Sequence, residues 1–377
     1  MTTIKKRFRS FSVAIILAAI TICLASCQHK ETKDGPLVIP IDVDQRSDAS
    51  TMFSGYSYIP LEMTDSSILG DIKALDVSDD LIGVQCSDVV YLFDHKGKYQ
   101  NTISRRGLGP EEYISIQDFK LHGNQVWIMS WENNAIFVYS QDGTFNKKIP
   151  LEYGYTSFTI YDDHTICLAS GSSNNSHQNF VFFDTDKNEV ISQHDEFTKN
   201  ESITFRKSPI VGKNGKTLYV THPFDHKIYA LTKDSFEPVE EYTFNTKLQL
   251  PDNSKELSYI DLSDQTRNKN VVCHLTTRHD TKDFSYLIFP LFGKYGIVYD
   301  IVQLKDGKQQ NLVALGEVID KKYPYLSDPR AIYKNKMVSI LTPSSIMYIE
   351  ENNGLHLFKD MQLTEEDNPV VFMHELR

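Results

Sequence analysis

The most constraining feature of this 377-residue sequence is a repeat of an apolar, aromatic strand, a polar turn and a second strand. Four such segments begin at residues 89, 135, 180 and 227, so that their starts lie 46, 45 and 47 residues apart. A period in the forties with several strands per unit is typical of β-propeller blades. The Asp142-Gly143 turn of the second segment supplies the positive φ that a tight hairpin needs. The repeat therefore predicts a propeller of four-stranded blades.

The pattern extends beyond these four hairpins. Two more strands precede each one, at 117–121 and 125–129 in the second unit and at 206–211 and 217–221 in the fourth. A fifth unit has expected strands at 271–276, 284–292, 296–304 and 311–318. Residues 251–267 break the pattern, and their loosely helical apolar spacing favours a short helical insertion between the fourth and fifth units.

A sixth unit lacks one strand of its own. Its expected strands are 330–333, 337–342 and 370–376, with a detour through 344–362. Residues 53–61, ahead of the first unit, could supply the missing outer strand and so remove an exposed sheet edge. Pro60 suits such a position because one side of an outer strand needs no N–H partner. The sequence thus predicts an all-β, six-bladed β-propeller over 37–377, closed by an N-terminal strand.

The first 26 residues have the composition of a secretion signal. Four cations lie within residues 1–10, and residues 11–26 carry no charge. This apolar run is shorter than the ~20 residues that a spanning helix needs, so it fits a signal peptide. It ends in Leu24-Ala25-Ser26-Cys27, which resembles the bacterial lipobox, whose cysteine is acylated. We therefore expect 1–26 to be a lipoprotein signal peptide and Cys27 to carry lipid.

The alternative is an ordinary signal peptide with an incidental cysteine. The polar residues that follow Cys27 end the apolar block there, which favours the lipobox. Several acyl chains, such as palmitate, make membrane anchoring effectively stable. In lipoprotein sorting an Asp after the cysteine favours inner-membrane retention, so Gln28 implies the outer membrane. Residues 27–36 are then a tether that holds the propeller at the periplasmic or cell surface.

The net charge of the chain disfavours one class of binding partner, and its cysteines have two possible states. Without residues 1–26 and their four cations, the formal charge changes from −11 to −15, which disfavours nucleic acid as a partner because nucleic-acid affinity depends on cations. Cys86, Cys167 and Cys273 remain, an odd number in an oxidising compartment. Each lies in a strand-like setting, so we expect buried apolar thiols, with a disulfide between two of them as the alternative.

Several segments together resemble the six-bladed β-propeller lipoproteins of anaerobic Gram-negative bacteria, which are related in fold to NHL-type propellers. They are the lipobox at Cys27, the loop 107–113 (Gly-Leu-Gly-Pro-Glu-Glu-Tyr), the hairpin 93–97 and the tail 367–372. The resemblance implies the fold and the location. It implies no reaction, because most members have no assigned activity.

One face of a propeller usually carries its function, namely the face with the loops between second and third strands and the connections between blades. We place there the segments 104–113, 130–134, 171–178, 222–226, 278–283 and 321–330. The first two hold the candidate ligand-binding residues, which are Arg105, Arg106, Glu111, Glu112, Tyr113, Trp131, Asn133 and Asn134. An exposed Trp beside amide side chains is common in sugar-binding sites, where the sugar ring stacks on the indole. The alternatives are that the charged pairs neutralise each other and that Trp131 packs on a neighbouring blade.

Catalytic and metal-binding patterns are weak. His222, Asp225 and His226 lie close in sequence, but a metal site would need further ligands, and none is identifiable. No nucleophile-elbow or zinc-protease motif occurs, so we expect no metal and no cofactor. We expect a non-enzymatic propeller that binds a glycan, peptide or protein. The alternative is a glycan-active hydrolase or lyase with acids drawn from several blades.

Overall fold

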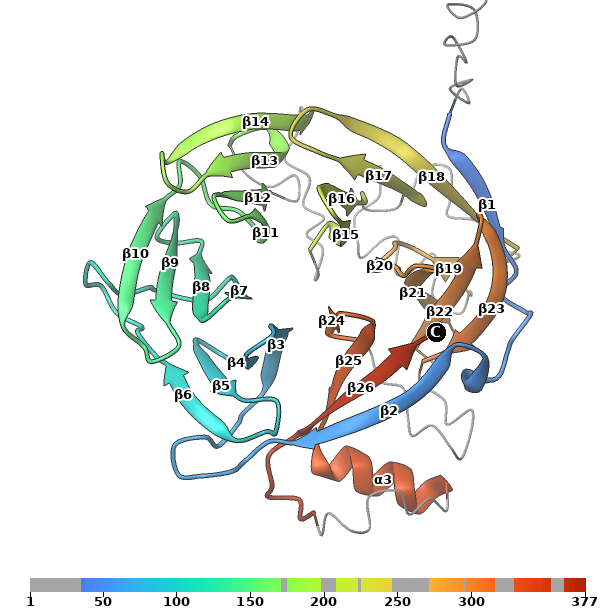
Figure 1. Cartoon of the computed structure of the whole chain (residues 1–377), viewed down its shortest axis with the longest axis horizontal. Coiled ribbons are helices and arrows are strands. Elements are labelled where there is room, and N and C mark those ends of the chain that lie inside the picture. Colours follow the sequence, from blue (N-terminus) through green and yellow to red (C-terminus); the bar gives the residue numbers. More distant parts are fainter. Residues whose placement is uncertain are drawn as a thin grey trace, which may run out of the picture. The chain divides into compact units, whose positions relative to one another are not determined.

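Six small β-sheets form a ring in the unit Leu37–Arg377 (Figure 1). This computed structural model describes residues 35–170, 175–197, 208–222, 225–245, 271–293, 296–315, 329–353 and 363–377. The six-bladed propeller predicted from the repeat is confirmed. The expected helical insertion at 251–267 lies outside the described residues.

The first three blades are antiparallel sheets of four strands, in chain order from the axis outward. Blade one has β3 (Ile72–Val77), β4 (Ile82–Cys86), β5 (Val89–Phe93) and β6 (Tyr99–Ile103). Blade two has β7 (Asp118–His122), β8 (Gln125–Ser130), β9 (Ala135–Ser140) and β10 (Phe145–Pro150). Blade three has β11 (Ser157–Asp162), β12 (Thr165–Ala169), β13 (Gln178–Asp184) and β14 (Glu189–Glu196).

Blades four and five depart from the expected strands. Blade four has β15 (Ile210–Asn214), β16 (Thr217–Val220), β17 (Lys227–Leu231) and β18 (Phe236–Phe244), and the unpredicted β1 (Leu37–Ile41) pairs in parallel with β18. Blade five has β21 (Ser285–Gly293), β22 (Gly296–Lys305) and β23 (Lys308–Ala314). Its predicted inner strand 271–276 is replaced by two short strands, β19 (Val271–Val272) and β20 (Thr277–Asp280), which both pair with β21.

Blade six is closed by the N-terminal strand as predicted. From the axis outward it has β24 (Ala331–Tyr333), β25 (Lys336–Leu341), β26 (Val370–Leu376) and β2 (Phe53–Pro60). Phe53 pairs with Leu376, and Pro60 pairs with Val370. The helix α3 (Pro343–Asn353) begins the predicted detour between β25 and β26.

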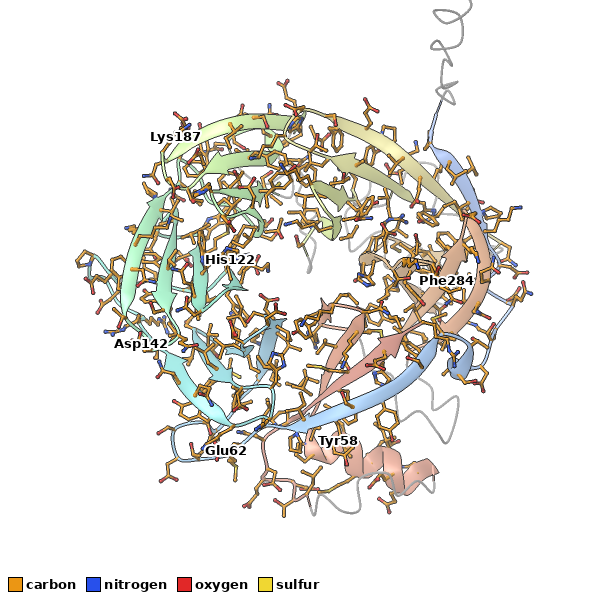
Figure 2. The ribbon with its side chains drawn as sticks, viewed as in Figure 1. Tyr58, Glu62, His122, Asp142, Lys187 and Phe284 are labelled. Carbon is orange, nitrogen blue, oxygen red and sulfur yellow. The ribbon has the colours of Figure 1, made fainter. Side chains whose placement is uncertain are left out.

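Residues 37–62, which we call the N-terminal belt, follow the outside of four blades. After β1, the Ser47 amide donates to the Leu312 carbonyl of blade five (2.8 Å). After η1 (Ala49–Thr51) and β2, the Glu62 amide donates to the Gly97 carbonyl of blade one (2.8 Å). Tyr58 and Glu62 lie at the outer edge of the ring (Figure 2). The belt therefore closes the ring and also braces blades four and five.

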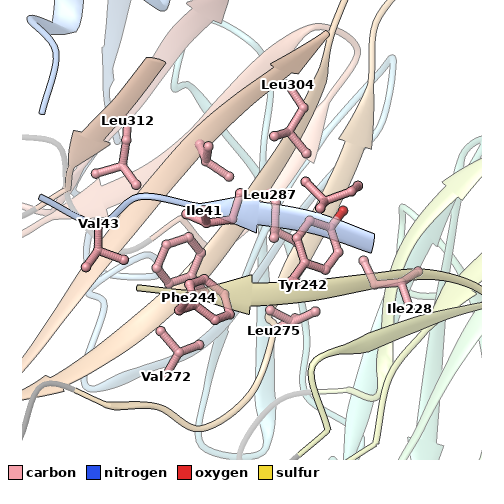
Figure 3. Packing of buried hydrophobic residues seen from close by; sticks show 13 residues of the cluster. Ile41, Val43, Ile228, Tyr242, Phe244, Val272, Leu275, Leu287, Leu304 and Leu312 are labelled. Carbon is pink, nitrogen blue, oxygen red and sulfur yellow. The ribbon is translucent and has the colours of Figure 1, made fainter. Parts of the chain in front are cut away.

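The hydrophobic core lies mainly between neighbouring blades. Figure 3 shows the cluster between blades four and five, where Ile39 and Ile41 of the belt are 0% and 1% exposed. They pack with Tyr242 and Phe244 of β18 and with Leu287 of β21. Burial of such a side chain stabilises a fold by about 1.5–3 kcal/mol, so the belt is part of the core.

Cys86, Cys167 and Cys273 are free and buried, as expected, and no two of them form a disulfide. Cys86 ends β4 and Cys167 lies in β12, as predicted. Cys273 was also predicted to lie in a strand, but it follows the end of β19. Burial raises the pKa of Cys273 to about 12, so this thiol stays protonated. Among the described residues, no helix has the length and apolarity to span a membrane.

Candidate functional site

The two predicted loops of blades one and two lie side by side on one face of the ring, which we call the upper face. Residues 104–117 connect β6 to β7, and residues 131–134 connect β8 to β9. The Ile114 amide donates to Asn133 Oδ1 (2.8 Å), and the Ser115 hydroxyl donates to the Glu132 carboxylate. Backbone and side-chain hydrogen bonds thus join the two loops into one surface.

Tyr113 is the buried anchor of the first loop. Its side chain is 0% exposed and makes edge-to-face contacts with Phe137 and Tyr139. Its hydroxyl donates to the Asp88 carbonyl (2.8 Å) and accepts the Arg105 amide (3.2 Å). Burial raises the pKa of Tyr113 to about 12. In this conformation Tyr113 cannot stack on a ligand, and it fixes the loop.

Glu112 closes the glycine turn of the same loop. The Gly109 amide donates to Glu112 Oε2 (2.8 Å), and the Gly107 amide donates to the Tyr113 carbonyl (3.0 Å). A Cβ on Gly107 would lie 1.9 Å from the Glu112 carboxylate, so any larger residue would displace that side chain. Glu112 therefore contributes to the shape of the loop.

The two arginines differ in their roles. Arg105 donates through Nη2 to the carbonyl of Gly143 (3.2 Å), which lies in the β9–β10 turn of blade two. The Arg106 guanidinium lies 3.4 Å from the Asp88 carboxylate, and 67% of its side chain is exposed. Beside it, Leu108 is 91% exposed. Arg105 thus links two blades, whereas Arg106 is open to a ligand.

The second loop also divides into scaffold and surface. Asn133 Oδ1 accepts from the Ser130 hydroxyl (2.7 Å) as well as from Ile114, which occupies it within the scaffold. Asn134 is exposed and adopts a φ of 44°. The Trp131 ring is half-buried against Gly154, where a Cβ would come within 2.8 Å of it. Part of Trp131 therefore packs on the next connection, and part stays accessible.

The exposed groups of this surface are mostly polar, together with the apolar side chain of Leu108 and one partly exposed aromatic ring. The polar ones are Arg105, Arg106, Glu111, Glu132 and Asn134, and the ring is that of Trp131. A cation, carboxylates, an amide and an indole on a fixed scaffold can orient a polar ligand by hydrogen bonds while a ring stacks on it. Because the loops are already ordered, little conformational entropy is lost on binding.

The His222–His226 segment does not converge on a metal. His222 Nε2 lies 3.2 Å from Asp195, and His226 Nε2 lies 2.7 Å from the Val272 carbonyl. Asp225 accepts from the Tyr229 hydroxyl (2.9 Å). Burial lowers the pKa of His226, which favours the neutral ring. Within the described ranges, no group of three or more His, Cys, Asp or Glu could hold a metal ion.

Segment 278–283 does not belong to the upper face, contrary to expectation. Arg278 lies in β20, and residues 281–284 form the turn into β21. The Arg278 guanidinium is almost wholly buried, 2.7 Å from Glu240 and 3.0 Å from Asp280, and lies 4.5 Å from the centre of the Tyr219 ring. These charges join blades four and five.

A second charged group on the inner strands was not predicted. Lys120 donates to Asp118 (2.8 Å), and the second oxygen of Asp118 accepts the Phe158 amide of blade three (3.0 Å). Asp76 of blade one accepts the Leu121 amide (2.7 Å), and burial raises the pKa of Asp76. Asp118 and Lys120 are two residues apart and so share one face of β7. That alternation was visible in the sequence, but the bonds to neighbouring blades were not.

Comparison with known proteins identifies the family of this chain. Residues 36–375 match the family described as Domain of unknown function (DUF4934). A solved structure of a protein from Bacteroides fragilis NCTC 9343, described as an exported protein, superposes on this chain with a TM-score of 0.67. The two sequences are 15% identical, and the match covers 90% of this chain and 99% of that one. A DUF4221 family member from Bacteroides vulgatus ATCC 8482 gives a TM-score of 0.49 at 12% identity, over 86% and 97%. No curated protein matches. On the family match, this chain belongs to the DUF4934 family.

Proposed function

We propose that this protein is an exported, lipid-anchored propeller that binds a polar ligand outside the cytoplasm. The basic and apolar segments before Cys27 support export, as does the exported description of the similar Bacteroides fragilis protein. The lipobox-like Leu24–Cys27 supports acylation of Cys27, and Gln28 supports the outer membrane as the destination.

Binding is assigned to the joined upper loops of blades one and two. The observation that carries this is the contrast between fixed and free groups: Tyr113 and Asn133 are held by backbone hydrogen bonds, whereas Arg106 and part of Trp131 are open. The ligand that fits is a neutral or mildly charged oligosaccharide or peptide. A polyanion does not fit a mature chain with a formal charge of −15.

Acylation is tested with a fatty-acid probe in cells that express the full chain. Wild-type protein should incorporate the probe and fractionate with membranes, and Cys27→Ala should do neither. Cys23→Ala, which alters a cysteine inside the signal segment, is the matched control and should label normally. Continued labelling of Cys27→Ala would overturn the anchor.

Ligand binding is tested with the 28–377 fragment on glycan and peptide arrays. Arg106→Ala and Trp131→Ala should each weaken any hit, because each removes an accessible contact and leaves Tyr113 and Asn133 in place. Lys96→Ala, on an exposed turn of blade one, is the control and should bind normally. A hit that survives both site variants would place binding elsewhere, and a carbohydrate hit that is cleaved would make the protein an enzyme.

A further inference from the structure

The belt enters the ring opposite the candidate ligand loops. Its first strand, β1, pairs with β18 at the outer edge of blade four, on the side of blade five, with Leu37 opposite Glu240. The candidate loops belong to blades one and two, which lie across the ring (Figure 1). The chain that follows Cys27 therefore joins the ring at Leu37, on the side away from the candidate loops.

The rim around Leu37 presents apolar side chains and two lysines, and also the acidic Asp306 and Glu241, of which Glu241 pairs with Val38. Leu37 and Val38 are 40% and 56% exposed, although Ile39 and Ile41 of the same strand are buried. A Leu37 methyl carbon lies 2.7 Å from where a Cβ on Gly307 would stand, so Leu37 covers the β22–β23 turn. Lys305 and Lys308 flank that glycine and are exposed, with Asp306 between them. We call Leu37, Val38, Lys305 and Lys308 the attachment rim.

The length of chain before Leu37 limits how far this rim can lie from a lipid-anchored Cys27. Ten residue steps separate Cys27 from Leu37, and a fully extended chain covers at most about 36 Å in that span. A domain of this size has a radius of gyration of about 20 Å and hence a diameter of roughly 50 Å. Leu37 therefore always lies within about 36 Å of the anchored cysteine, whereas the far rim of the ring can lie a further ~50 Å away.

We infer that the attachment rim rests on the surface of the membrane that holds the Cys27 lipid. The inference depends on the proposed acylation. Leu37 and Val38 enter the headgroup region, and Lys305 and Lys308 meet lipid phosphates, each a contact typical of peripheral membrane surfaces. The loops of blades one and two then lie on the side of the ring that is farthest from the membrane, where a large extracellular or periplasmic ligand can reach them.

The test compares lysine reactivity in lipidated protein bound to the outside of preformed vesicles of phosphatidylethanolamine and phosphatidylglycerol with that in detergent. A membrane-impermeant acylating reagent and peptide mass spectrometry report each lysine. Lys305 and Lys308 should react several-fold more slowly on vesicles. Lys96 and Lys98, an exposed pair in the equivalent turn of blade one, should react equally in both states.

Variants separate orientation from anchoring. Val38→Asp should restore the reactivity of Lys305 and Lys308 on vesicles, and Val190→Asp, at a 44% exposed valine on β14, should not. Fatty-acid labelling of the same samples reports acylation independently. Labelled protein with equal reactivity of both lysine pairs overturns the inference and leaves the anchor intact, whereas absence of label overturns the anchor itself.

Discussion

Arg46 of the N-terminal belt forms a two-pronged ion pair with Asp300 of blade five. The guanidinium Nη1 and Nη2 lie 2.6 and 2.9 Å from the two carboxylate oxygens, and the Asp300 side chain is 0% exposed. Parallel N–H···O bonds to a buried carboxylate fix both position and orientation. The pair therefore holds the belt in register between β1 and β2.

Replacing Arg46 should destabilise the propeller. Arg46→Ala removes the cation from beside a buried carboxylate, a change that typically lowers the free energy of unfolding by roughly 3 kcal/mol. Urea unfolding followed by tryptophan fluorescence measures it. Lys73→Ala, which breaks an exposed pair with Asp71, is the control and should change stability by less than ~1 kcal/mol. Equal losses in the two variants would show that the belt pair is not structural.

Removal of the whole belt should cost the fold its cooperativity. Deletion of 37–62 takes the outer strand from blade six and the apolar residues Ile39 and Ile41 from the core between blades four and five. We expect a lower and broader thermal transition by circular dichroism. Deletion of 28–36 alone is the control and should leave the transition unchanged. An unaltered melt after the longer deletion would mean that the ring closes without its N-terminal strand.

The sequence predicted features that a local pattern or a count of strands reveals. The four hairpins were predictable because strand alternation and turn residues are local signals. The distant pairing of β2 with β26 was predictable because the sixth unit lacked one strand and residues 53–61 offered it. The pairing of β1 with β18 joins residues about 200 positions apart, as in Leu37 opposite Glu240, and no local pattern indicates it. Residues 278–280 were expected in a loop between two strands, but they belong to β20, where Glu240 of the neighbouring blade supplies the buried partner of Arg278.

The candidate site shows the same limit. Adjacency of the two upper loops followed from blade order, and Ile114 and Asn133 do form a hydrogen bond. The order of the blades did not reveal which residues of these loops face outward. Tyr113 is inside because the carbonyl of Asp88, on another turn, accepts from its hydroxyl, and only the fold brings that carbonyl there.

Gly212 should tolerate no side chain. A Cβ at this position would lie 2.1 Å from the Arg278 carbonyl, a backbone atom of the neighbouring blade that cannot rotate away. Gly212→Ala should therefore separate blades four and five locally and destabilise the fold by about 1–3 kcal/mol. Chemical denaturation measures the loss. Gly70→Ala meets nothing within 4 Å and is the matched control; a similar loss there would remove the steric explanation.

Stability should fall in acid partly through Asp280. Burial favours the neutral acid, but Arg278 and hydrogen bonds from Ser285, Tyr219 and Asn214 outweigh it, so that the pKa of Asp280 lies below its ordinary value. A carboxyl with a lowered pKa in the folded state stabilises the fold above its unfolded pKa of about 4. That stabilisation is lost as the pH falls through the lower folded value. The free energy of unfolding of Asp280→Asn should therefore depend less on pH below 4 than that of wild type, when both are measured by urea titration at several pH values. Asp283→Asn, in the exposed turn that follows, should retain the wild-type dependence. If Asp280→Asn keeps the full acid sensitivity, the ion pair with Arg278 does not contribute to it.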